Sequence, residues 1–445
     1  MTAFRYEGFD LDSATRRVAC RYSLGDRHFI ERFTFPTGDR WDDPAATAAA
    51  RLLFLLAGVS YHKTAAPLVV ELPDTPLRPV EVGFLRTFYV DGLGEFAHRN
   101  GLDLTGLRIE AHVLDEPPVP PVPPVTGGSG RRRPLVPFGG GIDSIVSLEL
   151  VRPLADPALF VVGRPGDRFA AIERPAAVTG LPVVRAEREI DPQVLRSREL
   201  GFLNGHVPVT GIISAVAVTA AVLEGRDAVI MSNEWSSSSG NLVLGGGRTV
   251  NHQWSKGEAF EAGFRAVLAA SLGDRVDYFS RLRPYTELWI AERFAGLTGY
   301  HRTFQSCNRG FHIDPARRLD HWCGRCDKCC FIDLILAPFL DAATLREVFA
   351  GREPLDDLTL LPRFEDLVGT SGELKPWECV GDVDECRAAV ALAAPRPDRA
   401  GSPVLGALVE RLGAGLPNPA AVERLRRPLG THHVPDAYAT DDLLV

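Results

Sequence analysis

The chain has 445 residues, and 49 basic against 57 acidic side chains give a formal charge of −8. This length allows two or three domains with their own cores, which excludes a small disulfide-stabilised module. With 45% hydrophobic and 24% charged residues the composition is globular, and the negative balance argues against a nucleic-acid partner.

The first 115 residues predict a small α+β domain, because strand-like and helical patterns alternate there. The strand-like segments are residues 16–24, 27–35, 66–72 and 108–114, and the helical ones are 43–59 and 84–99. Residues 116–132 then hold a proline run followed by a glycine-serine run, typical of a linker between domains.

From residue 133 to 340 short apolar runs alternate with longer amphipathic ones, which predicts an α/β domain with a doubly wound parallel sheet. The expected strands are residues 134–138, 158–163, 181–187, 227–232 and 275–280, and the expected helices 144–152, 209–225 and 254–273. Ligands of such sheets bind at the carboxyl ends of the strands. Residues 341–445 are expected to form a mostly helical region and a tail.

No export signal is expected in the opening residues, and no membrane partner is expected either. The longest charge-free stretch, residues 200–223, contains Asn, His and Pro, so it predicts a buried helix rather than a membrane span. Four of the eight cysteines crowd into residues 323–330, which indicates metal binding in a reducing compartment, and hence the cytoplasm.

A glycine turn follows the first strand of the α/β domain and leads into an apolar helix. It contains Gly139, Gly140, Gly141, Asp143 and Ser144. Successive backbone N–H groups and the helix N-terminus favour phosphate, and a carboxylate beside them favours Mg²⁺. The Asp-Ser pair makes a phosphate site more specific than an ordinary tight turn.

This turn resembles the signature SGGxDS of the PP-loop ATP pyrophosphatases, with Gly139 in place of the serine. The resemblance implies an adenine nucleotide alpha hydrolase-like fold, and ATP cleavage between the α and β phosphates with Mg²⁺ at Asp143. It is not a Walker loop, because GK[ST] is absent.

Two overlapping CxxC steps and one earlier cysteine predict a metal site made of Cys307, Cys323, Cys326 and Cys329. Four thiolates suit Zn²⁺, but an iron-sulfur cluster uses the same ligands, so the metal stays open. The arrangement resembles the structural zinc site of the PP-loop enzymes that make 7-cyano-7-deazaguanine, which implies that Lys328 lies near phosphate.

Further polar segments lie next to predicted strands and helices. Ser232, Asn233 and Glu234 follow a strand directly, where ligands are expected, although a polar loop is the alternative. His206 precedes the helix at 209–225, where a hydrogen-bonding group at the helix start is the alternative to a base. His252 and Lys256 lie at the start of the expected helix 254–273, and Cys379 lies in a loop rich in ionisable groups.

Together these segments look like the UDP-N-acetylmuramoyl-L-alanyl-L-glutamate epimerase family over roughly residues 130–385. The segments are FGGGIDS, NGHVPVTG, SNEWSSSSGN, NHQWSK, RPYTELWIAERFA, SCNRGFH, CGRCDKC and KPWECVG. The resemblance implies an isomerase of peptidoglycan precursor synthesis. It would invert the terminal L-glutamate of the UDP-MurNAc dipeptide through an adenylated carboxylate, giving AMP and pyrophosphate, and would be coupled functionally to an L-glutamate-adding muramyl ligase.

In this hypothesis the nucleotide-binding residues include Ser232, Asn233 and Lys328 beside the glycine turn. Lys256 and Lys328 neutralise phosphate or carboxylate, and Glu234 borders the nucleotide and is a catalytic candidate. His252, His206 and Cys379 compete for the proton transfer, and the motifs do not decide among them.

Two alternatives stay open. One is another PP-loop enzyme, either a 7-cyano-7-deazaguanine synthase or a tRNA-modifying enzyme. The other is a nucleotide-sensing module that binds ATP without turnover, a reading that the missing loop serine supports.

Overall fold

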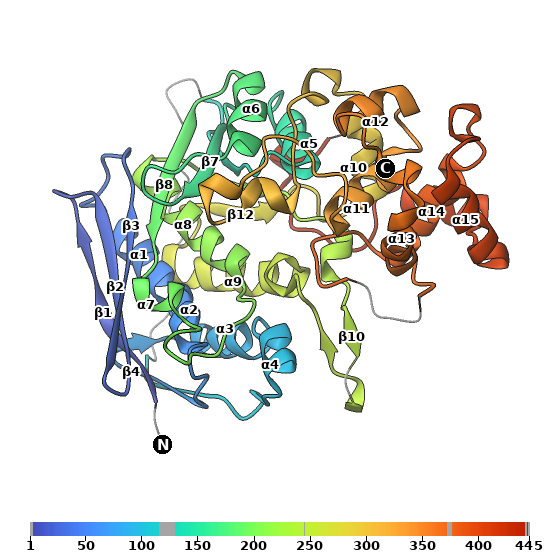
Figure 1. The fold of residues 1–445 in the computed structure, drawn as a ribbon. Helices are drawn as coiled ribbons and strands as arrows, with labels where there is room; N and C mark the ends of the chain where they lie inside the picture. Colours follow the sequence, from blue (N-terminus) through green and yellow to red (C-terminus); the bar gives the residue numbers. More distant parts are fainter. Residues whose placement is uncertain (1–2, 115–129, 244, 372–375, 441–442, 444–445) are drawn as a thin grey trace.

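A ten-stranded sheet forms the centre of the protein, whose structure is a computed structural model describing residues 3–114, 130–243, 245–371, 376–440 and 443. The strand order is β12-β9-β6-β7-β8-β3-β2-β1-β4-β5 (Figure 1). The strands are β1 Phe4–Asp12, β2 Arg17–Leu24, β3 Arg27–Thr34, β4 Val69–Leu77, β5 Arg108–Val113, β6 Leu135–Pro137, β7 Ala158–Gly163, β8 Val183–Glu189, β9 Ala228–Met231 and β12 Asp277–Ser280.

Helices surround this sheet, and a two-stranded ribbon of β10 (Leu242–Val243) and β11 (Thr249–Val250) projects from it. The α-helices are α1 Pro44–Ala57, α2 Val59–His62, α3 Pro79–Val90, α4 Gly94–Asn100, α5 Ile142–Val151, α6 Ala170–Thr179, α7 Pro192–Leu195, α8 Val209–Leu223, α9 Glu258–Leu272, α10 Glu287–Ala295, α11 Asp327–Leu336, α12 Ala342–Val348, α13 Leu361–Leu367, α14 Val383–Ala393, α15 Pro403–Leu412 and α16 Pro419–Leu425.

The predicted strands of the α/β region all form, and β12, β9, β6, β7 and β8 run parallel to one another. The mixed α/β class and the mostly parallel sheet are therefore confirmed. In the first 115 residues the predicted strands form as well, and the sequence analysis missed β1, which pairs with β2 and β4.

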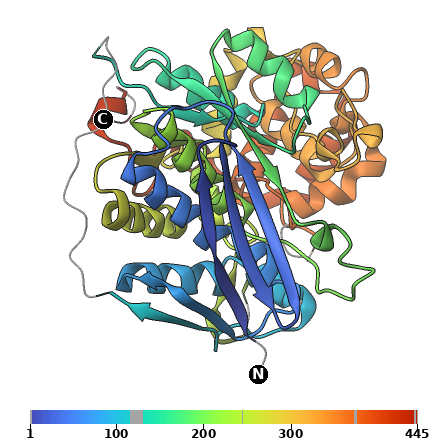
Figure 2. The same ribbon diagram turned by 90° about the vertical axis from the view of Figure 1, so that its left-hand side faces the viewer.

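The sheet is continuous across the two regions that the sequence analysis treats as separate domains. Strand β3 pairs antiparallel with β8, matching Phe33 with Arg188. The blue N-terminal strands thus lie on one side of the molecule and the orange and red C-terminal helices on the other (Figures 1 and 2). The division at residues 115 and 133 stays a prediction, and most of the predicted linker lies outside the described residues.

Alternate residues of the central strands enter two hydrophobic cores, because successive strand side chains point to opposite faces. Leu135 of β6 belongs to the core that includes α1, α3, α8 and α9, whereas Val136 belongs to the core that includes α5, α10, α11 and α14. Since the first core also contains β1 to β3, the N-terminal and central regions bury their apolar surface together.

Helix α8 confirms the buried helix expected from the charge-free stretch, since twelve of its fifteen residues are buried. One helical stretch of the described residues, Pro44–His62, is long and apolar enough to cross a membrane. Most of it is buried against α8 and the sheet, as is typical of a core helix.

The joint between β3 and β8 provides a test of the continuous sheet. Glu31 is fully buried and pairs with Arg188, whereas the exposed pair Arg32–Glu189 links the same two strands. We expect Arg188→Met to lower the free energy of unfolding by about 3–5 kcal/mol, because it leaves a buried carboxylate without its partner.

The matched control is Arg32→Met, which removes a solvated pair and costs about 1 kcal/mol or less. Urea unfolding followed by circular dichroism measures both variants. An equal decrease in the free energy of unfolding of the two variants would contradict a stabilising role of the buried Glu31–Arg188 pair.

Candidate functional site

A pocket of about 360 Å³ opens at the carboxyl ends of the parallel strands. It lies over β6, from which the sheet continues to β7 on one side and to β9 on the other. Strand order reverses at this point, and ligands of open α/β sheets bind there. The lining residues include Gly139, Gly141, Asp143, Ser144, Ser232, Asn233, Lys256, Ser306, Lys328 and Cys379.

The glycine turn joins β6 to α5 as the sequence predicts. Gly140 has a φ of +78°, and a Cβ there would lie 2.2 Å from the carbonyl oxygen of Ala171, so only glycine suits this position. Gly141 is the N-cap of α5, and its carbonyl oxygen accepts a hydrogen bond from Ser144 Oγ at 3.1 Å. The N-terminus of α5 is thus directed to the pocket that its first residues line.

Apart from the two chain neighbours of Gly139, no heavy atom of the described residues lies within 4 Å of the place where its Cβ would be. A serine would therefore be accommodated here, as in the PP-loop signature. The turn thus lacks one hydroxyl that the space at this position would admit.

Three carboxylates converge beside the turn, with oxygens of Asp143, Glu234 and Glu287 within 4.8 Å of one another. Burial and the negative charge of Glu234 raise the pKa of Asp143, and burial together with Asp143 raises the pKa of Glu287. Within the described chain, Asp143 Oδ1 and Glu287 Oε2 are buried without a hydrogen-bond partner. Such a cluster suits a divalent cation with oxygen ligands.

Glu287 was missed by the sequence analysis, although its segment was part of the family resemblance. It is the first residue of α10, and Thr286 caps that helix by accepting from the backbone N–H of Trp289. An acidic residue in a first helical turn is expected from the helix dipole alone, so its position gave no signal of a ligand.

Two lysines face these carboxylates. Burial would lower the pKa of Lys256, but Cys379, Glu234 and Asp143 raise it overall. Lys328 is buried, and Glu287 and Asp143 likewise raise its pKa against the effect of burial. Both side chains therefore stay ammonium groups, suited to phosphate or carboxylate.

Cys379 lines the same pocket, in a loop distant in sequence from the glycine turn. Its carbonyl oxygen accepts a hydrogen bond from Lys328 Nζ. Burial would raise the pKa of the thiol, but the charges of Lys256 and His252 lower it to about 7. A large thiolate fraction at neutral pH follows.

His252 and His206 are not among the residues that line the pocket, and their ring centroids lie 4.3 Å apart. His252 contacts Glu95 through Nδ1. Burial would lower the pKa of His252, but Cys379 and Glu95 raise it to about 9, whereas burial and His252 lower the pKa of His206 to about 4. His252 is thus the protonated member of the pair at neutral pH.

Glu95 was also missed, because it comes from α4 in the N-terminal region and no motif links it to His252. Ser306 is a third missed residue. Its hydroxyl and that of Ser232 are buried without a hydrogen-bond partner in the part of the chain that the structure describes. Both hydroxyls are therefore free to hydrogen-bond a polar ligand in the pocket.

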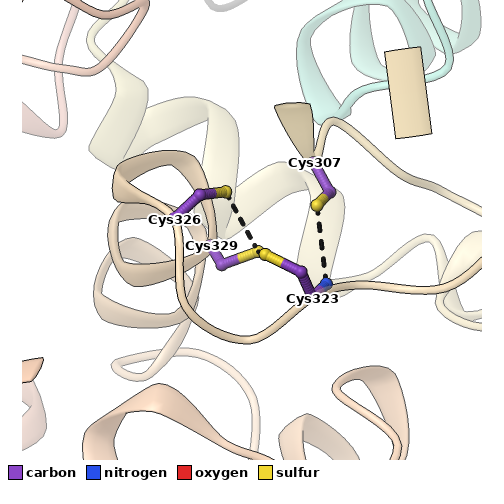
Figure 3. Close-up of side chains that lie close together, drawn as sticks. All are labelled: Cys307, Cys323, Cys326 and Cys329. Atoms are coloured by element: carbon purple, nitrogen blue, oxygen red, sulfur yellow. Dashed lines mark hydrogen bonds between the residues drawn. The ribbon is translucent and has the colours of Figure 1, made fainter. Parts of the chain in front are cut away.

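The four cysteines come together as predicted (Figure 3), with all sulfur atoms within 4.8 Å of one another. Sγ of Cys329 lies 3.6 Å from that of Cys323 and 3.5 Å from that of Cys326. Tetrahedral Zn–S bonds of about 2.3 Å place sulfurs about 3.8 Å apart, so the set fits such an ion. Since Lys328 precedes Cys329 in α11, the cluster also anchors a pocket lysine.

Comparisons with known proteins now identify the family. The chain matches the MurL N-terminal domain over residues 1–281 and the MurL C-terminal domain over residues 303–422. The chain belongs to the MurL family. The resemblance seen in the sequence is thereby confirmed and extends to the N-terminal region, and the two MurL domains divide inside the predicted 133–340 unit.

Three curated relatives are named UDP-N-acetyl-alpha-D-muramoyl-L-alanyl-L-glutamate epimerase, and an epimerase is an isomerase. The MurL relative of Salinispora tropica is 40% identical over 99% of this chain and 95% of its own. Those of a Micromonospora strain and of Xanthomonas oryzae pv. oryzae are 38% and 39% identical, over 99% and 88% of this chain and 97% and 85% of their own. No solved structure matches the chain.

The cysteine cluster predicts a resident metal ion. We expect Cys326→Ser to lose about one metal ion per chain, because three thiolates cannot complete the tetrahedral set. Inductively coupled plasma mass spectrometry of the purified protein measures the content and distinguishes zinc from iron.

The control is Cys330→Ala, which removes a buried neighbouring thiol outside the cluster. Unchanged metal content in Cys326→Ser, or its loss in Cys330→Ala, would contradict this ligand set.

Proposed function

We propose that this protein inverts the terminal L-glutamate of UDP-MurNAc-L-Ala-L-Glu to D-glutamate in peptidoglycan precursor synthesis. It would consume ATP through an adenylated carboxylate and release AMP and pyrophosphate. The names of the MurL relatives support the substrate and the inversion. One observation supports the ATP chemistry: the glycine turn, Asp143, two lysines and Cys379 line one pocket, and the carboxylates of Glu234 and Glu287 lie beside Asp143.

The nucleotide would lie over β6, in a PP-loop fold. Backbone N–H groups of Gly139 to Gly141 and the N-terminus of α5 suit its phosphates, while Ser232 and Asn233 border it from the end of β9. Asp143, with Glu234 and Glu287, would hold Mg²⁺, which neutralises phosphate charge when bound. Lys256 and Lys328 add positive charge beside it.

Adenylation answers a chemical problem of this substrate. Removing the Cα proton beside a free carboxylate would place a second negative charge next to an existing one. In the mixed anhydride the carboxyl group itself carries no charge, so the charge of the carbanion passes to its carbonyl oxygen, where the fixed ammonium groups of Lys256 and Lys328 stabilise it. Hydrolysis of the anhydride then makes the inversion effectively irreversible.

The cysteine cluster would hold a structural Zn²⁺ that keeps Lys328 and the adjoining loop in place. The soluble nucleotide-linked substrate implies a cytoplasmic location and functional coupling to a muramyl ligase that adds L-glutamate. The named relatives favour the epimerase over a 7-cyano-7-deazaguanine synthase, a tRNA-modifying enzyme or a nucleotide sensor.

The test is incubation with UDP-MurNAc-L-Ala-L-Glu, ATP and Mg²⁺ in deuterated water, followed by mass and chiral analysis of glutamate. We expect D-glutamate with one deuterium, together with AMP and pyrophosphate. Asp143→Asn should reduce pyrophosphate release by at least about 10²-fold, because it removes a charge that would hold the cation of the nucleotide.

Asp156→Asn serves as the control, since Asp156 forms an exposed pair with Arg131 before the start of β7 and should leave the rate unchanged. Inversion without ATP, or near-normal pyrophosphate release by Asp143→Asn, would refute the adenylation route.

A further inference from the structure

Three segments far apart in the sequence meet around one thiol. Cys379 lines the pocket, His252 interacts electrostatically with its thiol, and Glu95 of α4 contacts Nδ1 of His252. We propose that these residues form a thiol–imidazole–carboxylate triad in which Cys379 is the base that removes the Cα proton and Glu95 is a positioning residue. This inference rests on the proposed function and names its proton acceptor.

The pocket lining selects Cys379 among the candidates. Cys379 and Lys256 line the pocket, whereas neither His252 nor His206 is among its lining residues. Lys256 is unsuited to accept a proton, because the surrounding negative groups raise its pKa. The thiol is therefore the one candidate base that combines access to substrate with an ionised form near neutral pH.

His252 acts from behind the thiol. Its side chain is 12% exposed, its Nδ1 contacts Glu95, and its charge lowers the pKa of the Cys379 thiol. Glu95 is 6% exposed and favours the imidazolium, which in turn favours the thiolate. The same order of groups activates nucleophilic cysteines in other enzymes, where a third group orients the histidine.

The loop that carries Cys379 is held from both regions of the molecule. Asn241 Nδ2 donates to the carbonyl oxygen of Pro376 at 3.2 Å, and Asn308 Nδ2 donates to Glu378 Oε2 at 2.5 Å. From α4, the guanidinium of Arg99 lies 5.5 Å from the Trp377 ring. Helix α4 thus contacts both His252 and the loop that carries Cys379.

Glu95, His206 and His252 also offer three ligand atoms within 4.8 Å of one another, as a metal site would. The contacts of His252 favour a proton on its ring rather than a metal ion between these side chains. Nδ1 of His252 already contacts the Glu95 carboxylate. His252 and Lys256 both interact electrostatically with the Cys379 thiol, so two positive charges already lie near it. Metal content therefore becomes an outcome of the test.

The proton balance is simple. The Cα proton passes to Sγ of Cys379, the electron pair stays on the substrate as an enolate, and a solvent-derived proton enters the opposite face. No oxidant or reductant is needed. The thiol then returns its proton to solvent, so one deuterium per inversion is expected in deuterated water.

The test measures the ionisation of Cys379 without substrate, from the pH dependence of its alkylation by iodoacetamide, followed by peptide mass spectrometry. Its charged surroundings are Lys256, Lys328 and His252, with Glu95 and His206 next to His252. Glu95→Gln should move the midpoint upward from about 7, by about one pH unit, because a less basic His252 stabilises the thiolate less.

In Glu95→Asp the midpoint of alkylation should stay near that of the unchanged protein, since this variant keeps the carboxylate. The control is Glu81→Gln, which alters another buried carboxylate that pairs with Arg51 away from the pocket. It should leave the midpoint unchanged. An unchanged midpoint in Glu95→Gln, or loss of a stoichiometric metal ion from that variant, would overturn the triad.

Activity gives the second readout. Cys379→Ala should lower deuterium incorporation roughly 10²–10⁴-fold while ATP-dependent pyrophosphate release stays within a few-fold of the unchanged protein. Near-normal deuterium incorporation would overturn the assignment of the base. If the unchanged protein itself shows no ATP-dependent inversion, the proposed function fails, whereas the alkylation profile still decides the thiol–imidazole–carboxylate contact.

Discussion

A buried ion pair between Arg283 and Glu261 connects the segments that build the pocket. Both side chains are 2% exposed, and Nε of Arg283 donates to Glu261 Oε2 at 2.9 Å. Nη1 donates to the carbonyl oxygen of Glu234 and to Ser237 Oγ, and Nη2 donates to the carbonyl oxygen of Lys256. One planar cation thus sets the relative position of a carboxylate and a lysine of the site, and Glu261 also accepts the backbone N–H of Ser280 at the end of β12.

The pocket concentrates charge that a protein interior normally excludes. Asp143, Glu234 and Glu287 repel one another in a setting where burial raises the pKa of Asp143 and Glu287, and Lys256 and Lys328 only partly compensate. Such an arrangement costs folding free energy and is typical of functional sites, where a ligand supplies the missing charge. Here the missing charge would be a divalent cation bound together with the phosphates of a nucleotide.

The continuous sheet gives the N-terminal region a part in this site. Because β3 pairs with β8 and the two regions share one hydrophobic core, α4 is held against the loop of His252 and the loop of Cys379. Glu95 can therefore act on a thiol nearly three hundred residues away in the sequence. A separate, loosely linked domain would not hold a carboxylate at hydrogen-bond distance from a buried imidazole.

The sequence by itself determined the parallel strands, the glycine turn and the cysteine set, because local periodicity and close spacing encode them. Gly139, Gly141, Asp143 and Ser144 line one pocket with Ser232 and Asn233, as expected from strand ends. Only the tertiary structure decided the joint between β3 and β8 and the contacts of Glu287 and Glu95. Pairing between distant strands and contacts between distant carboxylates have no local pattern: they arise when burial of shared apolar surface brings remote segments together.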